Sequence, residues 1–156
     1  MRGTLLGWVI SGVGYVVLGA LLPTSITLLQ SIGIAAVCLA ASLALGLVLA
    51  ASLRRWRREI DAVFPQSGSA LDITLRYLTN TTEQALLFSV VAAALILSGP
   101  EIARNWLAEA GLWFLIARTL FAVGFAHDPV ARAIGYTATL HPTLILLAIA
   151  GWAAFT

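Results

Sequence analysis

The sequence predicts an all-α, polytopic membrane helix bundle, and three observations support this prediction. Hydrophobic residues make up 60% of the 156 residues and charged residues only 10%, whereas a soluble domain carries about 25% charged residues. The mean hydropathy is +0.96. The apolar segments reach about 18 residues or more, the length that a membrane-spanning helix requires. Only short connections separate them, so the chain has no room for a separate soluble domain and membrane lipid is its expected environment.

The first apolar run, residues 5–22, is interpreted as a retained membrane helix. No convincing small-residue cleavage site of a signal sequence follows it. Within it, Gly7 and Ser11 have the spacing of small residues that permits two helices to pack closely. We expect this run to be an extra N-terminal transmembrane helix, contained in residues 1–25, that precedes a membrane domain of residues 26–156.

The membrane domain itself contains four further apolar segments. Turn-forming residues separate them, including Gly99-Pro100 and Asp128-Pro129. Each segment is long enough to cross the bilayer as a helix. The predicted spans are residues 26–53, 71–97, 102–126 and 130–155.

A basic cluster orients the predicted bundle in the membrane. Residues 54–58, Arg-Arg-Trp-Arg-Arg, follow the second span directly and are the densest positive charge in the chain. Such clusters stay on the cytoplasmic side of a membrane. Five spans then place the amino terminus in the cytoplasm and Thr156 outside, with Arg104 the only arginine in the outer connections. We expect an integral protein of a bacterial inner membrane.

The third span carries an unusual ladder of polar residues. Asp72, Arg76, Asn80 and Glu83 follow one another at helical spacing, so they fall close together on one face of a helix. Charge inside a membrane helix is costly and usually faces a bundle interior, a partner or a polar ligand. This ladder is therefore the first candidate for a functional site.

The two following spans bring more cationic groups to the same depth. Arg118 lies in the fourth span, and Arg132 and Tyr136 share a face of the fifth. Together with Arg76, these arginines outnumber the one nearby carboxylate, Glu83. An unpaired buried guanidinium costs several kcal/mol, so an anion should complete the site. A small ligand with carboxylates suits the planar, bidentate donors of arginine.

Two other interpretations need no such ligand. In the first, Glu83 pairs with Arg118 while Asn80 bridges two helices. Arg76 and Arg132 then extend to lipid phosphates. In the second, Glu83 acts as a relay in a small transport or ion-pathway subunit.

Three short patterns occur in order along the last three spans. They are Arg76-xxx-Asn80-xx-Glu83, Ala117-Arg118 and Pro129-xx-Arg132-xxx-Tyr136. Together they resemble the MAPEG family, the membrane-associated proteins in eicosanoid and glutathione metabolism, which includes microsomal glutathione transferases and prostaglandin E synthase. The resemblance covers roughly residues 26–155. It implies four helices per subunit, a homotrimer, and glutathione bound between subunits near the cytoplasmic face.

The resemblance implies a role for each matching residue. Arg132 would lie near the sulfur as the catalytic residue, Tyr136 would pack beside the tripeptide, and Arg118 would brace Glu83. The expected activity is conjugation of glutathione to lipophilic electrophiles, or reduction of hydroperoxides with it, because a fixed cation enriches the reactive thiolate. The residues expected to bind glutathione are Arg76, Asn80, Glu83, Arg118, Arg132 and Tyr136.

Several positions depart from the pattern of the family. Phe121 and Phe125 stand where family enzymes usually carry hydrogen-bond donors, and Ala133 stands where the prostaglandin synthases carry a serine. Prostaglandin synthesis is therefore not expected.

The resemblance also implies that Arg54 or Arg55, from an adjacent subunit, would reach the ligand. The alternative is a non-catalytic trimer whose polar cluster binds a lipid headgroup or is structural. The sequence predicts no metal site and no nucleic-acid partner.

Overall fold

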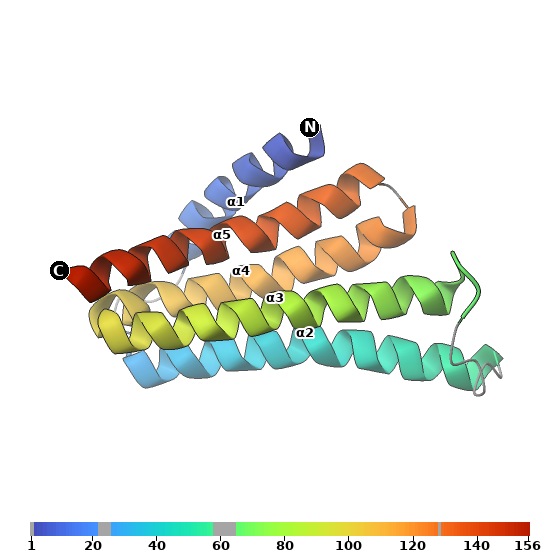
Figure 1. Ribbon diagram of the computed structural model, residues 1–156, viewed down its shortest axis with the longest axis horizontal. Coiled ribbons are helices and arrows are strands. Elements are labelled where there is room, and N and C mark those ends of the chain that lie inside the picture. The colour runs from blue at the N-terminus through green and yellow to red at the C-terminus, as the bar shows by residue number, and fades with distance from the viewer. Residues whose placement is uncertain (1, 22–25, 58–64, 128) are drawn as a thin grey trace.

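The described residues of the computed structural model, 2–21, 26–57, 65–127 and 129–156, form five α-helices that alternate in direction (Figure 1). Each helix is long and apolar enough to cross a membrane. This confirms the predicted all-α membrane bundle. The helices are α1 (Arg2–Leu21), α2 (Leu28–Arg57), α3 (Ala70–Ser98), α4 (Pro100–His127) and α5 (Pro129–Phe155).

The helix boundaries follow local sequence signals. At the start of α3, the Ser69 side chain accepts a hydrogen bond from the Asp72 backbone N–H at 3.2 Å, as an N-cap does. At its end, the Gly99 N–H donates to the Leu95 carbonyl at 2.8 Å. Pro100 then begins α4, two residues before the predicted start, because proline fits the first helical position where no N–H is needed. Pro23-Thr24-Ser25, whose composition indicates a turn after the first apolar run, lies outside the described residues.

Helix α4 is the centre of the bundle. It contacts each of the other four helices, and it is the most buried of the five spans. Small residues allow this close approach: a Cβ atom placed on Gly111 would lie only 2.5 Å from the Cα atom of Ala35 on α2. Any polar residue on the inner face of α4 is consequently enclosed on several sides.

The extra helix α1 lies obliquely against α5 and α4 (Figure 1). A Cβ atom on Gly7 would lie 1.9 Å from the Thr137 hydroxyl oxygen of α5, so only glycine permits this approach. Ser11, one turn further, has its hydroxyl 3.4 Å from the Ala138 carbonyl oxygen. The predicted close packing at Gly7 and Ser11 is therefore confirmed.

A proline in α5 creates the polar anchor for this contact. Pro142 lies inside the helix and has no N–H, so it cannot donate the helical hydrogen bond to the Ala138 carbonyl. That carbonyl instead accepts from the indole Nε1–H of Trp113 on α4, at 2.8 Å, and from Ser11 on α1. The backbone group that proline leaves unpaired thus ties three helices together, as neighbouring helices do for prolines in membranes.

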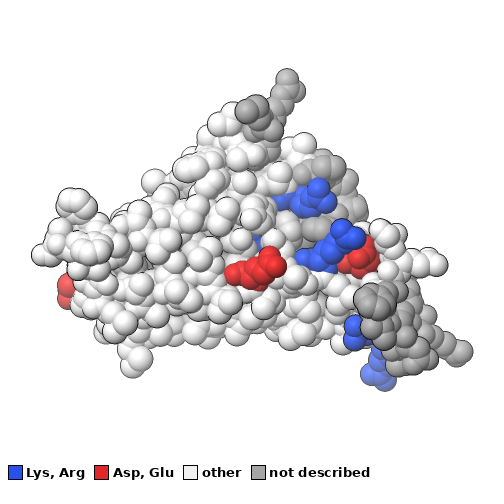
Figure 2. All heavy atoms as spheres, in the orientation of Figure 1, with Lys and Arg blue, Asp and Glu red and all other residues white. Residues whose placement is uncertain are grey.

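The basic residues in view concentrate at one end of the bundle (Figure 2). Helix α2 ends there and helices α3 and α5 begin there, and the basic atoms visible on the face in Figure 2 gather at this end. At the opposite end, Arg104 in the second turn of α4 lies 2.7 Å from the carboxylate of Glu101. The bundle is therefore asymmetric in charge along its long axis.

Candidate functional site

A hollow of about 410 Å³ opens between α3, α4 and α5. Its volume lies within the usual range for small-molecule sites, roughly 300–1,000 Å³. The residues that line it combine two arginines with an amide, a phenol and apolar groups. They are Arg76, Asn80, Phe121, Arg132, Ala133 and Tyr136.

The cap of α3 also fixes the position of Arg76. The Asp72 carboxylate accepts from the Gly68 backbone N–H at 2.9 Å, and on its other side it accepts from Arg76 Nε at 3.0 Å. The Arg76 side chain is nevertheless 61% exposed, because only its Nε end is held by this pair. Its remaining donors can therefore reach a ligand in the hollow.

Arg118 stands behind the hollow and is fully buried. One of its terminal nitrogens donates to Asn80 Oδ1 at 2.7 Å, and the other donates to the Gly135 carbonyl oxygen at 3.2 Å and to the Thr139 hydroxyl. Arg118 thus links α4 to both α3 and α5. It is not among the residues that line the hollow, so its effect on a ligand would act through Asn80.

Two aromatic rings complete the surroundings of this guanidinium. The Arg118 Cζ atom lies 4.6 Å from the ring centroid of Phe121 and 5.8 Å from that of Phe114, distances at which cation–π attraction operates. Phe121 cannot donate a hydrogen bond, as the sequence indicated, yet it both holds Arg118 and lines the hollow. The side chain of Phe125 lies outside the described part of the chain.

The predicted contact between Arg118 and Glu83 is not formed within the described part of the subunit. Arg118 uses Asn80 as its partner on α3, while Glu83 is exposed on the outer surface of that helix. The reason is angular: Asn80 and Glu83 are three residues apart and differ in direction by about 60° on an α-helix. Asn80 therefore faces α4, whereas Glu83 is exposed on the outside of the bundle.

Helix α5 presents Arg132 and Tyr136 to the hollow from successive turns. Close packing brings them near α4: a Cβ atom on Gly135 would lie 2.6 Å from the Cα atom of Phe121. Ala133 also lines the hollow and, unlike a serine, offers no hydroxyl to a ligand there. Arg54 and Arg55 are exposed at the end of α2 and do not line the hollow.

Two residues that hold Arg118 were not predicted as part of the site. Thr139 follows Tyr136 by three residues, so helical spacing would have placed it on the same stripe of α5. Gly135 supplies a backbone carbonyl, which leaves no signal in side-chain patterns. The only clue in the sequence is that Gly135 is a small residue beside Tyr136, and small residues permit close helix packing.

These observations define a class of protein. The chain is an integral membrane protein with a partly enclosed, arginine-bearing hollow between three of its spans. The sequence model of the MAPEG family matches residues 34–152, most of the chain, and the protein belongs to the MAPEG family. Helix α1 precedes the matched region. No curated protein and no solved structure matches the chain.

Proposed function

We propose that the protein binds glutathione in the hollow and conjugates it to lipophilic electrophiles, or uses it to reduce lipophilic hydroperoxides. Family membership supports the choice of glutathione. The observation that carries the proposal is the placement of Arg76 and Arg132 on two helices that border one hollow, with Asn80 and Tyr136 one turn further along the same two helices. Arginines separated in this way suit a ligand that carries two carboxylates.

The polar residues divide the binding work by their chemistry. Arg76 would bind a carboxylate of glutathione with the donors that Asp72 leaves unused, and Asn80 would donate its amide N–H because its oxygen accepts from Arg118. The hydrogen bond from Arg118 thereby fixes the orientation of that amide. Tyr136 would pack beside the tripeptide.

Arg132 would act on the sulfur. A free thiol has a pKa of about 8.5 and is mostly protonated at neutral pH. A guanidinium held beside the sulfur stabilises the thiolate, which is the nucleophile. The thiolate then attacks an electrophilic carbon and displaces a leaving group. Alternatively, it attacks the terminal oxygen of a hydroperoxide, and the O–O bond breaks to leave glutathione sulfenic acid and an alkoxide that takes a proton to become the alcohol. A second glutathione then reduces the sulfenic acid, which gives glutathione disulfide and water. The apolar second substrate would reach the site from the lipid.

We propose that the functional unit is a homotrimer, which family membership supports. The position of Glu83 supports a contact between subunits. Glu83 is exposed on α3, 13 residues after the helix begins at Ala70, well inside the span. A carboxylate that faces acyl chains near the bilayer centre costs about 2.5–3.5 kcal/mol on insertion scales. A neighbouring subunit would remove that cost, and it would bring a second surface, including Arg54 or Arg55, to the ligand.

The first prediction concerns glutathione affinity. Titration calorimetry of the protein in nanodiscs is expected to show binding that Arg76→Ala and Arg132→Ala each weaken by about tenfold or more, the loss of one charge-assisted interaction. Turnover of an activated aryl halide should fall further in Arg132→Ala than binding does, because Arg132 also stabilises the thiolate.

Arg104→Ala is the matched control for this experiment. The Arg104 side chain is also partly exposed, at 41%, but it lies at the opposite end of the bundle from Arg76 and Arg132 and pairs with Glu101. Its removal should leave affinity unchanged. Absence of heat at millimolar glutathione in the wild-type protein would refute glutathione binding.

The second prediction concerns assembly. Native mass spectrometry from a mild detergent is expected to give three copies of the chain. We expect Glu83→Leu to favour dissociated subunits, because it removes a polar contact of this carboxylate at the interface. A protein that is monomeric already would not respond to this substitution. A monomer at all protein concentrations would contradict the trimer.

A second candidate function is binding of a phospholipid headgroup without catalysis. Phe121 and Ala133 favour it, because these two residues line the hollow without offering any hydrogen-bond donor to a thiol. An anionic phosphate would still be attracted by Arg76 and Arg132. Co-purified phospholipid that millimolar glutathione fails to displace, together with no turnover, would support this candidate.

A further inference from the structure

The reduction of a hydroperoxide needs a proton that the conjugation of an aryl halide does not need. A halide leaves as a stable anion. The alkoxide that leaves a hydroperoxide is a strong base, and its departure is fast only when an acid protonates it as the O–O bond breaks. The two reactions proposed for this protein therefore require different groups in the hollow.

Among the residues that line the hollow, only Tyr136 is suited to supply that proton. Two of the others are arginines, whose guanidinium groups keep their protons in proteins. The remaining three offer an amide, a benzene ring and a methyl group, none of which acts as an acid. A phenol is protonated at neutral pH and transfers its proton readily to an alkoxide, which is the stronger base.

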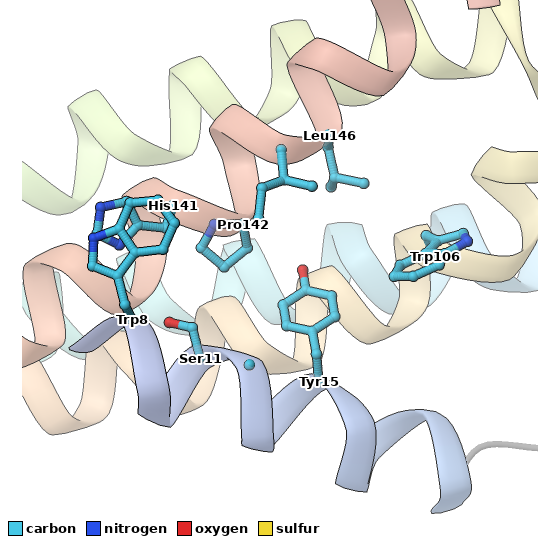
Figure 3. A pocket seen from close by; sticks show the side chains of 9 residues that line it. Trp8, Ser11, Tyr15, Trp106, His141, Pro142 and Leu146 are labelled. Atoms are coloured by element: carbon cyan, nitrogen blue, oxygen red, sulfur yellow. The ribbon is translucent and has the colours of Figure 1, made fainter. Parts of the chain in front are cut away.

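The other two tyrosines of the chain lie elsewhere. Tyr77 is buried, and its hydroxyl donates to the Ser42 carbonyl oxygen of α2 at 3.1 Å. Tyr15 lies on α1, where it and Trp106 line a separate apolar cavity of about 210 Å³ between α1, α4 and α5 (Figure 3). Tyr136, which is partly exposed, is thus the one of the three tyrosines that borders the hollow.

The spacing of Tyr136 from Arg132 suits the geometry of the reaction. Both residues line the hollow from α5, and four residues correspond to a rise of about 6 Å along a helix. In the proposed reaction Arg132 holds the sulfur, the attacked terminal oxygen lies beside it, and the leaving oxygen is one covalent bond further away. A second donor, one turn beyond the first, is therefore placed for the leaving oxygen.

The buried network around Arg118 fixes the backbone that carries Tyr136. Arg118 donates to the Gly135 carbonyl oxygen at 3.2 Å and to the Thr139 hydroxyl. The Thr139 hydroxyl in turn donates to the Tyr136 carbonyl oxygen at 2.9 Å. Proton transfer requires a donor within hydrogen-bond reach of the leaving atom, and a site on a rigid element holds its groups more precisely than a loop does. The Tyr136 side chain therefore borders the hollow from a fixed point of α5.

We propose that Tyr136 is a catalytic residue, the general acid that makes lipophilic hydroperoxides substrates of this protein; this inference rests on the proposed glutathione site. The thiolate held by Arg132 attacks the terminal oxygen. The S–O bond forms, and the O–O bond breaks with its electron pair on the leaving oxygen. Tyr136 gives its proton to that oxygen, and the alcohol leaves. Solvent returns a proton to the phenolate, and a second glutathione reduces the sulfenic acid to give glutathione disulfide and water.

Steady-state kinetics in nanodiscs test the proposal with glutathione and two second substrates, cumene hydroperoxide and 1-chloro-2,4-dinitrobenzene. Tyr136→Phe keeps the ring but loses the acid, so its kcat/KM for cumene hydroperoxide should fall about 100-fold or more, the usual contribution of a general acid. Its turnover of 1-chloro-2,4-dinitrobenzene, which loses chloride, should stay unchanged, and so should the pH dependence of that turnover. Calorimetry should give the same affinity for glutathione as in the wild-type protein.

Tyr15→Phe is the matched control. It makes the same chemical change in the separate cavity between α1, α4 and α5, and it should leave both activities unchanged. Retained conjugation in Tyr136→Phe would itself show that this variant is folded and still activates the thiol.

Three results would overturn the proposal while the proposed glutathione site stands. Equal losses of both activities in Tyr136→Phe would show that the hydroxyl serves the tripeptide or the thiolate and not the leaving oxygen. Undiminished reduction of cumene hydroperoxide would show that the proton comes from another group. A wild-type protein that conjugates glutathione but reduces no cumene hydroperoxide would also contradict it. Absence of glutathione binding in the wild-type protein would instead overturn the proposed function and this inference together.

Discussion

At the scale of single residues, Arg118 shows how this bundle accommodates a buried positive charge without a carboxylate. Its partners in the described part of the chain are an amide oxygen, a backbone carbonyl, a hydroxyl and two aromatic rings. Each replaces part of the hydration that the guanidinium loses on burial. The sequence predicted that Arg118 needs a partner, but it indicated Glu83 where the structure uses Asn80.

This arrangement predicts the effect of Thr139→Val. The substitution keeps the shape of the side chain but removes an acceptor from a buried charged donor, so it should lower the free energy of unfolding by about 1 kcal/mol. Thermal unfolding in nanodiscs measures the change. Thr119→Val is the control, since Thr119 is exposed and its hydroxyl donates to Leu115 of its own helix. Equal effects of the two substitutions would contradict the role given to Thr139.

At the scale of helices, glycine positions decide how closely the spans that form the hollow approach one another. A Cβ atom on Gly135 would lie 2.6–2.7 Å from three atoms of Phe121, two of them in the backbone. Backbone atoms of a packed helix cannot yield locally. The face of α5 that carries Arg132 and Tyr136 is therefore held against α4 by the absence of a side chain between them.

Gly135→Ala should consequently separate α4 from α5. We expect a loss of about 1–3 kcal/mol of stability from overpacking and a weaker affinity for glutathione, measured by thermal unfolding and calorimetry. Gly151→Ala on the same helix is the control, because a Cβ atom there meets nothing within 4 Å. That control should be neutral or slightly stabilising, since alanine favours helix more than glycine does. Matching losses in both variants would refute the packing argument.

At the scale of the whole molecule, the uneven distribution of charge along the bundle suggests its orientation. Arg54, Arg55, Arg76 and Arg132 lie on helix ends that share one end of the bundle, whereas Arg104 lies at the other (Figure 1). Positive charge is retained on the cytoplasmic side. We therefore propose that the protein lies in a bacterial inner membrane and that the hollow opens on its cytoplasmic side. The cytoplasm is the compartment that contains glutathione.

Cysteine labelling tests this orientation. In a Cys38→Ala background, Ser67→Cys precedes α3 at the basic end and Glu101→Cys lies near the start of α4 at the other end; both positions are exposed. A membrane-impermeant maleimide added to intact cells should label Glu101→Cys and should label Ser67→Cys only after lysis. The reverse pattern would invert the topology.

The sequence by itself determined the spans and named four of the six residues that line the hollow. Runs of apolar residues that are long enough to cross the bilayer form helices, because lipid offers no hydrogen-bond partner to backbone groups and a helix pairs them within the segment. Helical spacing then placed Arg76, Asn80, Arg132 and Tyr136 on the faces that border one hollow. These properties depend on composition and periodicity within single helices, which a sequence states directly.

Only the tertiary structure decided what these helices do to one another. It paired Arg118 with Asn80, and it used the Ala138 carbonyl beneath Pro142 to tie α1 to α4 and α5. It also brought the Trp8 ring of α1 against the His141 ring of α5. Such contacts depend on the rotation and offset between neighbouring helices. A difference of about 60° in rotation exchanges one polar partner for another, and the periodicity of a single chain does not specify that angle.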